Sequence, residues 1–201
     1  MANTDNAIGF VPTLKSQAGG EVRLTTCALA SSYGTALGRG DPVEYTGASG
    51  TEHAYIQKAA AENVDNCGIF MGVHYVDVNG NPVYSDYWPA STVTEGTKDA
   101  VAMVCTDPNV TMVIQCDTLA AGDIGALADW DAGTPSATTR KSGVELVASS
   151  TGTTGKSIRI KRLAATKNAD GSDNAFGAYA KAEVTWAEHI EKTGAAGAGG
   201  V

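Results

Sequence analysis

The sequence lacks the close ligand spacings that mark a metal or redox centre. Its four cysteines, which form no CxxC pair and lie in or beside apolar strand-like runs, are Cys27, Cys67, Cys105 and Cys116. The three histidines, His53, His74 and His189, stand far apart and match no HExxH pattern. Zinc and redox sites are built from closely spaced ligands of these two types. We therefore expect four buried free thiols, no metal and no cofactor.

Long apolar runs are also absent. No segment approaches the roughly eighteen apolar residues that a membrane span requires. The opening MANTDNAIGF shows no basic stretch followed by an apolar run, which is the pattern of a secretory signal. We expect a soluble protein that starts out in the cytosol and has no membrane partner.

Basic residues are few, and their distribution is uneven. The net charge of −8 and the isoelectric point near 4.8 argue against direct nucleic-acid binding, which clustered Lys and Arg residues drive. Seven of the fourteen basic residues nevertheless fall within 140–167, where Glu145 is the sole acid, so this segment carries +6 and the remainder −14. The segment is either a hairpin with a solvated charged face or a basic edge that docks on an acidic neighbour, such as another copy of the chain.

Recognisable catalytic signatures are missing as well. Residues 150–157, STGTTGKS, end like a phosphate-binding loop, but Ser150 replaces the first glycine, and the alternation of Ile158 and Ile160 with basic residues predicts a strand where that motif needs a helix. There is no G-x-S-x-G elbow, and the carboxylate pair around Trp130, in Asp129-Trp130-Asp131, is expected to lie in a solvated turn. We predict no catalytic residues and no enzymatic activity.

Two further motifs are interpreted as coincidences. Residues 39–41 spell Arg-Gly-Asp, but we found no secretion signal that would bring them to a cell surface. Residues 167–174, KNADGSDN, gather oxygen ligands, but a calcium loop starting at Asn168 would need glycine where Asp173 stands. We expect an exposed loop there.

Short strand-like segments recur between turn residues along most of the chain. Segments of alternating, β-branched residues come about every ten positions and are separated by Gly, Asp, Asn and Thr. This pattern predicts a mainly β protein, an antiparallel barrel or sandwich with short helical segments. We expect an N-terminal arm over 1–20, a body over 21–189 and a Gly/Ala-rich C-terminal tail over 190–201, with 2–14 and 190–201 reaching across neighbouring copies.

Three hairpins are predicted from turn chemistry. The first joins 67–78 to 82–88 through Asn79-Gly80, the second joins 100–105 to 110–116 through 106–109, and the third joins 144–150 to 157–163. Alternation places Tyr84, Asp86 and Trp88 on one face of the first hairpin. On the second, it predicts a core face that consists of Val110, Met112, Ile114 and Cys116.

Two segments also suit a helix. Residues 119–130 favour a short one. Residues 178–192 contain helix-forming Ala, Glu and Lys but also alternate, with one side made of Ala178, Ala180, Ala182, Val184 and Trp186. A helix would scatter those residues around its surface, so we predict a strand.

Several stretches, taken in order, resemble the capsid cement or decoration proteins of tailed bacteriophages. They are NTDNAIGFVP, YGTALGRGDPVEYTG, the long block from IQKAAAENVDNCGIF through MGVHYVDVNGNPVYSDYWPA, and FGAYAKAEVTWAEH. The long block carries most of the resemblance, with a GD-V strand before it, a strand ending in KAA, a G-F-GV-Y strand and a hairpin closing on YWPA.

The resemblance implies a β-barrel-like virion protein. Such a protein binds the exterior of the icosahedral shell, stabilises contacts between major capsid protein subunits and assembles as a homotrimer, after a stage in the host cytoplasm. It implies no individual functional residue. The alternatives are an enzyme with a divergent site, a tail or tube protein, and a carbohydrate- or receptor-binding module. The last requires that the aromatic residues cluster on the surface, namely Tyr33, Tyr45, Tyr75, Tyr84, Tyr87 and Trp88.

Overall fold

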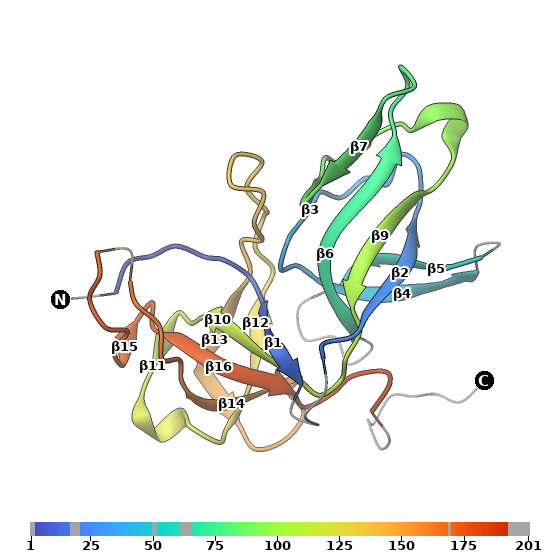
Figure 1. Ribbon diagram of the computed structural model, residues 1–201. Coiled ribbons are helices and arrows are strands. Elements are labelled where there is room, and N and C mark those ends of the chain that lie inside the picture. The colour runs from blue at the N-terminus through green and yellow to red at the C-terminus, as the bar shows by residue number, and fades with distance from the viewer. Residues whose placement is uncertain (1–2, 17–20, 50–51, 61–65, 169, 193–201) are drawn as a thin grey trace.

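Two lobes, each with its own six-stranded sheet, make up the chain (Figure 1). The computed structural model describes residues 3–16, 21–49, 52–60, 66–168 and 170–192. Lobe 1 contains β2 (Leu24–Leu29), β3 (Leu37–Gly38), β4 (Pro42–Ser49), β5 (Ala54–Lys58), β6 (Asn66–Val76), β7 (Pro82–Ser85), β8 (Tyr87–Trp88), η1 (Glu95–Thr97) and β9 (Ala100–Cys105). Lobe 2 contains β1 (Val11–Ser16), β10 (Val110–Gln115), β11 (Thr118–Leu119), η2 (Ala121–Asp123), β12 (Leu127–Asp131), β13 (Glu145–Gly152), β14 (Ile158–Leu163), β15 (Gly177–Ala178) and β16 (Lys181–Trp186).

Lobe 1 is a closed five-stranded barrel. Its strands follow the order β4-β5-β2-β9-β6, a pairing between β4 and β6 closes the ring, and β7 extends β6 beyond it. Gly68 permits the close crossing of β6 over β9, because a Cβ atom there would lie 2.2 Å from the Cys105 carbonyl oxygen. The interior holds apolar side chains from all five strands, including Cys27, Val43, Ile56, Phe70 and Val104.

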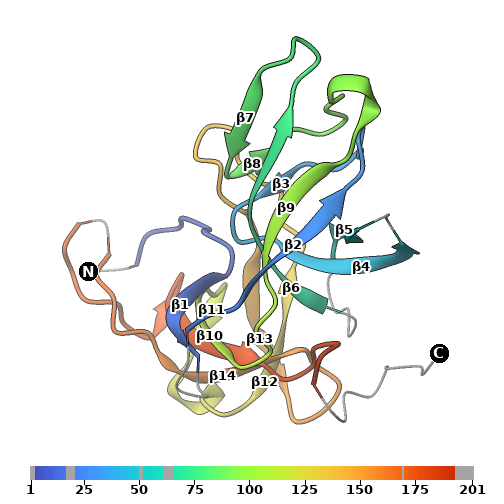
Figure 2. The same cartoon turned by 45° about the vertical axis from the view of Figure 1, so that its right-hand side comes forward.

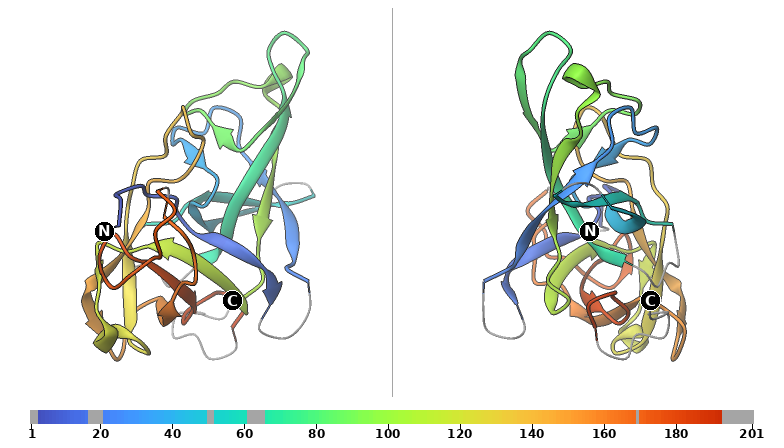
Figure 3. Two further views of the ribbon diagram at one scale, coloured as in Figure 1. Left: turned by 60° about the vertical axis from the view of Figure 1, so that its left-hand side comes forward. Right: turned by 90° about the vertical axis from the view of Figure 1, so that its right-hand side faces the viewer.

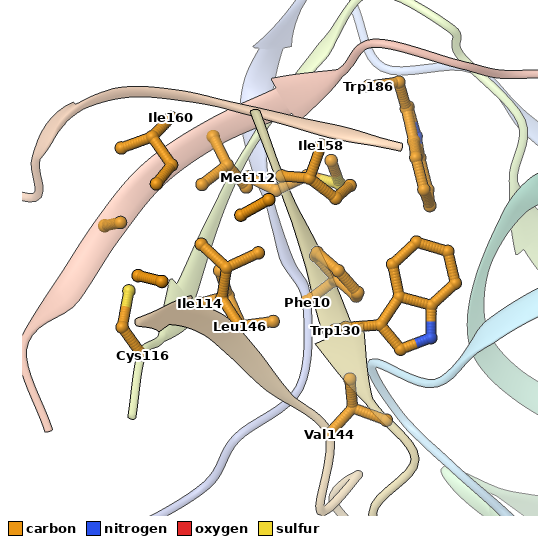
Figure 4. Close-up of a cluster of buried hydrophobic side chains, with 14 of the residues drawn as sticks. Phe10, Met112, Ile114, Cys116, Trp130, Val144, Leu146, Ile158, Ile160 and Trp186 are labelled. Atoms are coloured by element: carbon orange, nitrogen blue, oxygen red, sulfur yellow. The ribbon is translucent and has the colours of Figure 1, made fainter. Parts of the chain in front are cut away.

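Lobe 2 is a second, partly closed barrel. Its strand order is β1-β10-β16-β14-β12-β13, and a parallel bridge from Cys116 to Leu146 brings β13 back to the end of β10. Three aromatic side chains lie at one end of its core (Figure 4). The ring centroids of Phe10 lie 5.8 Å from Trp130 and 5.6 Å from Trp186, and those of the two tryptophans are 6.1 Å apart. The Phe10–Trp130 and Trp130–Trp186 contacts are edge-to-face, a geometry that favours a single, well-defined packing.

The predicted fold class is confirmed, since the structure is mainly β with a closed barrel and further antiparallel sheets. The strand prediction for 178–192 is also confirmed in its central part, β16, where Ala182, Val184 and Trp186 are buried, as is Ala180 just before the strand. Ala178 departs from the pattern because it lies in the separate short strand β15 and is exposed. In 119–130 the helix is only the short 3-10 turn η2, and the segment ends in β12.

The first predicted hairpin is present as β6 and β7, which pair antiparallel across Asn79-Gly80 and project from lobe 1 (Figure 2). The predicted assignment of Tyr84, Asp86 and Trp88 to one face is wrong near the end of the second strand. Tyr84 is 75% exposed, whereas Trp88 is fully buried. The Ser85 hydroxyl accepts a hydrogen bond from the Tyr87 amide and the strand breaks there, so that β8 pairs with β3 instead and turns Trp88 into the core.

The second predicted hairpin is wrong, although its turn forms. The Asp107 carboxylate accepts a hydrogen bond from the Asn109 amide at 2.8 Å, as an Asx turn requires. The strands on either side do not pair, because β9 belongs to the sheet of lobe 1 and β10 to that of lobe 2. The turn therefore links the two lobes. The predicted core face of β10 is nevertheless confirmed, since all of its four residues are fully buried.

The third predicted hairpin is wrong for a different reason. Strand β12 lies between β13 and β14 and pairs antiparallel with both of them. Residues 153–157 therefore cross β12 instead of turning back beside β13. An ion pair between Lys156 in this crossing segment and Asp129 on β12 holds the crossing in place.

The N-terminal segment differs from the expected arm. Strand β1 pairs with β10 through Val11 and Pro12, and Phe10 is 1% exposed in the core of lobe 2. The side-chain amide of Asn3 donates hydrogen bonds to the carbonyl oxygens of Ala175 and Ala178. Residues 3–16 are thus held by their own chain. Strand β1 runs beside β10 (Figure 3), and Phe10 completes the aromatic cluster (Figure 4). The expected tail lies outside the described residues from 193 onward.

Among the helical turns of the described residues, none is long and apolar enough to cross a membrane.

Candidate functional site

The seam between the lobes is built around the loop 38–41. The Gly40 carbonyl oxygen accepts a hydrogen bond from the Phe10 amide at 2.9 Å, and the Gly40 amide donates to the Phe70 carbonyl oxygen at 2.9 Å. On the other side of the loop, the Arg39 amide donates to the Arg140 carbonyl oxygen and the Ser142 amide to the Arg39 carbonyl oxygen, both at 3.0 Å. Backbone hydrogen bonds thus fix this loop of lobe 1 to two segments of lobe 2.

A buried carboxylate secures this loop. Asp41 is fully buried, and its oxygens accept hydrogen bonds from the Gly38 amide at 2.8 Å and the Ser142 hydroxyl at 2.6 Å. The Lys58 ammonium lies 3.1 Å from the same carboxylate and also donates to the Gly133 carbonyl oxygen at 2.7 Å. Both charges are therefore paired and hydrogen-bonded, as buried charges must be. Because Lys58 belongs to lobe 1 and Ser142 and Gly133 to lobe 2, the pair connects the lobes.

A groove opens on the surface beside this seam, with a volume of about 270 Å³. Its apolar floor comes from both lobes and consists of Ile8, Phe10, Val11, Pro12 and Met71. Its polar rim consists of Arg39, Asp86, Thr139, Arg140 and Lys141. The groove therefore joins apolar surface to a rim with three cations and one carboxylate.

The rim charges are only partly paired. The Arg39 guanidinium lies 3.4 Å from the Asp86 carboxylate, and both side chains are about half exposed. Arg140 and Lys141 have no acidic partner within the described ranges, and both are exposed. Arg140 adopts a left-handed backbone with φ of 60°, which is strained for a residue with a side chain. The loop thus holds two unpaired cations at the rim.

The basic segment 140–167 does not form one continuous patch. Three of its seven cations have carboxylate partners, namely Lys156 with Asp129, Arg162 with Glu183, and Lys167 with Asp173. Arg159 donates a hydrogen bond to the Gly125 carbonyl oxygen. The cations at the groove, Arg140 and Lys141, are the part of the segment that fits the docking interpretation.

The STGTTGKS stretch has a structural role. The Lys156 ammonium lies 2.7 Å from one oxygen of Asp129, and the Ser157 amide donates to the other at 3.1 Å. Asp129 is 5% exposed, so the crossing of residues 153–157 over β12 neutralises a carboxylate in the sheet. The expectation that Asp129 and Asp131 flank Trp130 in a solvated turn is wrong, since all three lie in β12.

The predicted buried, free thiols are confirmed at all four cysteines. Burial raises the pKa of Cys27 and of Cys105 to about 11 and that of Cys116 to about 12, and it also raises the pKa of Cys67. A thiol becomes a nucleophile or a metal ligand as the thiolate. The described part of the chain places no three His, Cys, Asp or Glu residues where they could hold a metal ion.

His189 lies apart from the other two histidines and is fully buried. Its Nδ1 atom accepts a hydrogen bond from the Glu191 amide at 3.1 Å, so in the neutral ring the proton is on Nε2. Burial lowers the pKa of His189 to about 4. The adjacent Ile190 amide donates to the Asn66 carbonyl oxygen, so this segment attaches lobe 2 to the start of β6.

The aromatic residues do not form a shared surface platform. Trp88 is fully buried, and Tyr33, Tyr45 and Tyr75 pack partly buried against the lobe 1 core. Tyr84 is the exposed exception, and its ring stacks on His74 with centroids 5.4 Å apart.

The remaining motifs serve local structure. In the Arg-Gly-Asp tripeptide, the Asp41 carboxylate is enclosed at the seam and is not presented at the surface. In the 167–174 loop, residue 169 lies outside the described residues, and an ion pair joins Lys167 to Asp173.

Sequence reasoning missed the Asp41–Lys58 pair and the groove. Both partners stand in motifs that we noted for their layout, the GD-V strand and the strand ending in KAA. A lone lysine at the end of an apolar strand was the available signal. Comparison with family models, with curated proteins and with solved structures gave no match for this chain.

Proposed function

We propose that this protein is a bacteriophage virion protein that binds the exterior of the icosahedral capsid and stabilises contacts between major capsid protein subunits. The proposal includes self-association, as a homotrimer, and a passage through the host cytoplasm during assembly. It rests on the sequence resemblance and on what the polar groups of the body do.

The observation that carries the proposal is the structural use of the buried polar groups. The buried acids Asp41 and Asp129 pair with lysines that hold loops and lobes together. The thiols are enclosed and their pKa values are raised. A protein whose buried polar groups serve its own folding is suited to act through the surface by which it contacts its neighbours. A protein that binds the assembled shell more tightly than the separate shell subunits stabilises the shell by mass action. The effect is multiplied because many copies bind each particle.

Electron cryo-microscopy of virions that contain this protein tests the proposal. We expect density for a two-lobed β body on the outside of the shell, in contact with more than one major capsid protein subunit. Removal of the gene is expected to lower the temperature at which the particles rupture. Density inside the shell, in the tail or nowhere on the particle would contradict the proposal.

A carbohydrate- or receptor-binding module is the second candidate, because Tyr84 is 75% exposed and its ring stacks on His74 at the base of the projecting hairpin. Exposed aromatic faces bind the apolar faces of sugars. A glycan array with the purified protein and with Tyr84→Ala tests this candidate. Binding that Tyr84→Ala abolishes would support it, and a blank array would leave the capsid proposal without this competitor.

A further inference from the structure

The groove presents positive charge on a chain that is negative overall. Arg39, Arg140 and Lys141 face Asp86 alone, whereas the whole chain carries −8. Its apolar floor adds contact area to this charge. Pro12 disfavours addition of another strand to the edge of β1, because its ring nitrogen cannot donate a hydrogen bond. A partner is therefore expected to dock through carboxylate side chains on a folded surface.

The chain carries such a surface on lobe 2. Asp131 lies directly opposite Glu145 in the β12–β13 register, and like charges so placed repel each other. The Gln115 side-chain amide bridges two of the carboxylates, donating to Glu145 at 2.6 Å and to Asp5 at 3.1 Å. We call Asp5, Asp117, Asp131 and Glu145 the acidic cluster.

The acidic cluster has no cationic partner in its own chain. Among the described residues, no lysine or arginine forms an ion pair with any of its four members. Burial, followed by the charges of Asp5, Asp117 and Asp131, raises the pKa of Glu145, while the hydrogen bond from Gln115 lowers it. The cluster and the groove share no residue. The described part of the chain therefore carries an acidic cluster, in which Asp5 and Asp131 are exposed, and a groove with two unpaired cations, Arg140 and Lys141.

We propose that copies of this protein bind one another by seating the acidic cluster of one copy against the basic groove of the next. The inference deepens the proposed function, because it names the surfaces through which copies meet. The contact pairs the cations of Arg140 and Lys141 with carboxylates that repel one another in the free chain. Charge complementarity of this kind sets the register and the speed of association.

Salt dependence gives the first test. Sedimentation equilibrium of the full-length protein is expected to show association at about 0.1 M salt and dissociation towards 1 M, as the Debye length falls from about 10 Å to about 3 Å. A protein that is monomeric at low salt, or an oligomer that salt does not weaken, would overturn the inference.

Charge reversal identifies the surfaces. The double variant Arg140→Glu/Lys141→Glu and the double variant Asp5→Lys/Asp131→Lys are each expected to weaken association at least tenfold. We expect a chain with all four substitutions to regain part of the association, because the two new carboxylates of the groove meet the two new ammonium groups of the cluster, which still contains Asp117 and Glu145. Circular dichroism verifies folding, and recovery in the four-site chain shows that the losses were electrostatic. Unchanged association in either double variant, or no recovery, contradicts the inference.

Lys98→Glu/Lys161→Glu is the matched control. It changes the net charge as much as the groove variant does, at exposed lysines outside both surfaces, and is expected to associate like the wild type. Co-sedimentation with capsids that lack the protein separates the two proposals. Self-association without capsid attachment would refute the proposed capsid binding alone. Capsid attachment as an oligomer that both double variants leave intact would refute this inference alone.

Discussion

The two lobes are built from the chain in different ways. Lobe 1 is one continuous stretch whose sequence neighbours pair directly, β4 with β5 and β6 with β7, before β4 and β6 close the barrel. Lobe 2 combines both ends of the chain, since β10 pairs with β1 and with β16. The residues of the turns therefore predict strand pairing well in lobe 1. They fail to predict it in lobe 2, where strands that are distant in the sequence pair because they bury a common core.

The two cores are nevertheless joined. The hydrophobic cluster of lobe 2 includes Ala59, Ile69 and Cys105, which belong to the lobe 1 segment. Together with the Asp41–Lys58 pair, this shared cluster predicts that the lobes open as one cooperative unit. The four predictions that follow test that expectation and the contrast between the lobes.

Thiol labelling tests the coupling most directly and has the largest expected effect. All four cysteines should react with a thiol reagent at least about a thousandfold more slowly in the native than in the unfolded chain, because opening costs about 5 kcal/mol or more. Mass spectrometry of the labelled peptides gives the rate at each site. Equal rates indicate joint opening. Labelling of Cys27 and Cys67 well before Cys116, which lies in lobe 2, would show that lobe 1 opens alone.

Asp41→Ala should lower the free energy of unfolding by about 3–5 kcal/mol. The substitution leaves the Lys58 ammonium, which is 13% exposed, without its buried counterion. Urea denaturation followed by tryptophan fluorescence measures the loss. Asp86→Ala removes the exposed partner of Arg39 and is the control, with an expected loss of about 1 kcal/mol or less. Equal losses for both variants would contradict the role of Asp41 at the seam.

His189 should make the seam sensitive to acid. Its pKa is lowered to about 4 in the folded protein from an ordinary 6.5, so the unfolded chain binds the proton first as the pH falls. The stabilisation is complete above about pH 6.5 and is lost towards pH 4, on the order of 3 kcal/mol in all. Urea midpoints across this range measure it.

The pH profile of His189→Gln should lack this component. His74→Gln alters an exposed histidine and should follow the wild type. If His189→Gln loses stability between pH 6.5 and 4 as steeply as the wild type, the effect belongs to other groups.

The smallest effect is expected on the outer face of lobe 2. Arg162 and Glu183 form a two-pronged hydrogen-bonded pair at 2.9 and 2.7 Å, but the Arg162 side chain is 67% exposed. Arg162→Ala should therefore leave the free energy of unfolding nearly unchanged. A loss comparable to that of Asp41→Ala, measured by the same urea titration, would remove the contrast between seam and surface charges.

The segments that sequence reasoning placed correctly are those with strong local patterns. Alternation located β10 and β16 and identified their buried faces, and Asn79-Gly80 located the β6–β7 turn. The turn at 106–109 was predicted from its Asp and Pro residues. A turn of this kind can join two paired strands of one sheet or, as here, link strands of two different sheets, so its residues do not determine the pairing. The candidate site was not predicted because Arg39 and Arg140 lie a hundred residues apart in the chain and meet only at the seam.

By itself, the sequence determined the β class, the positions of most strands, the burial of the thiols and the excess of negative charge, because each of these depends on residues close together or on composition. Tertiary structure alone decided which strands pair, that Asp41 and Asp129 are buried against lysines, and where the unpaired cations and acids are displayed. Those features depend on contacts between distant segments, whose free energy arises only when both lobes are folded around the shared core.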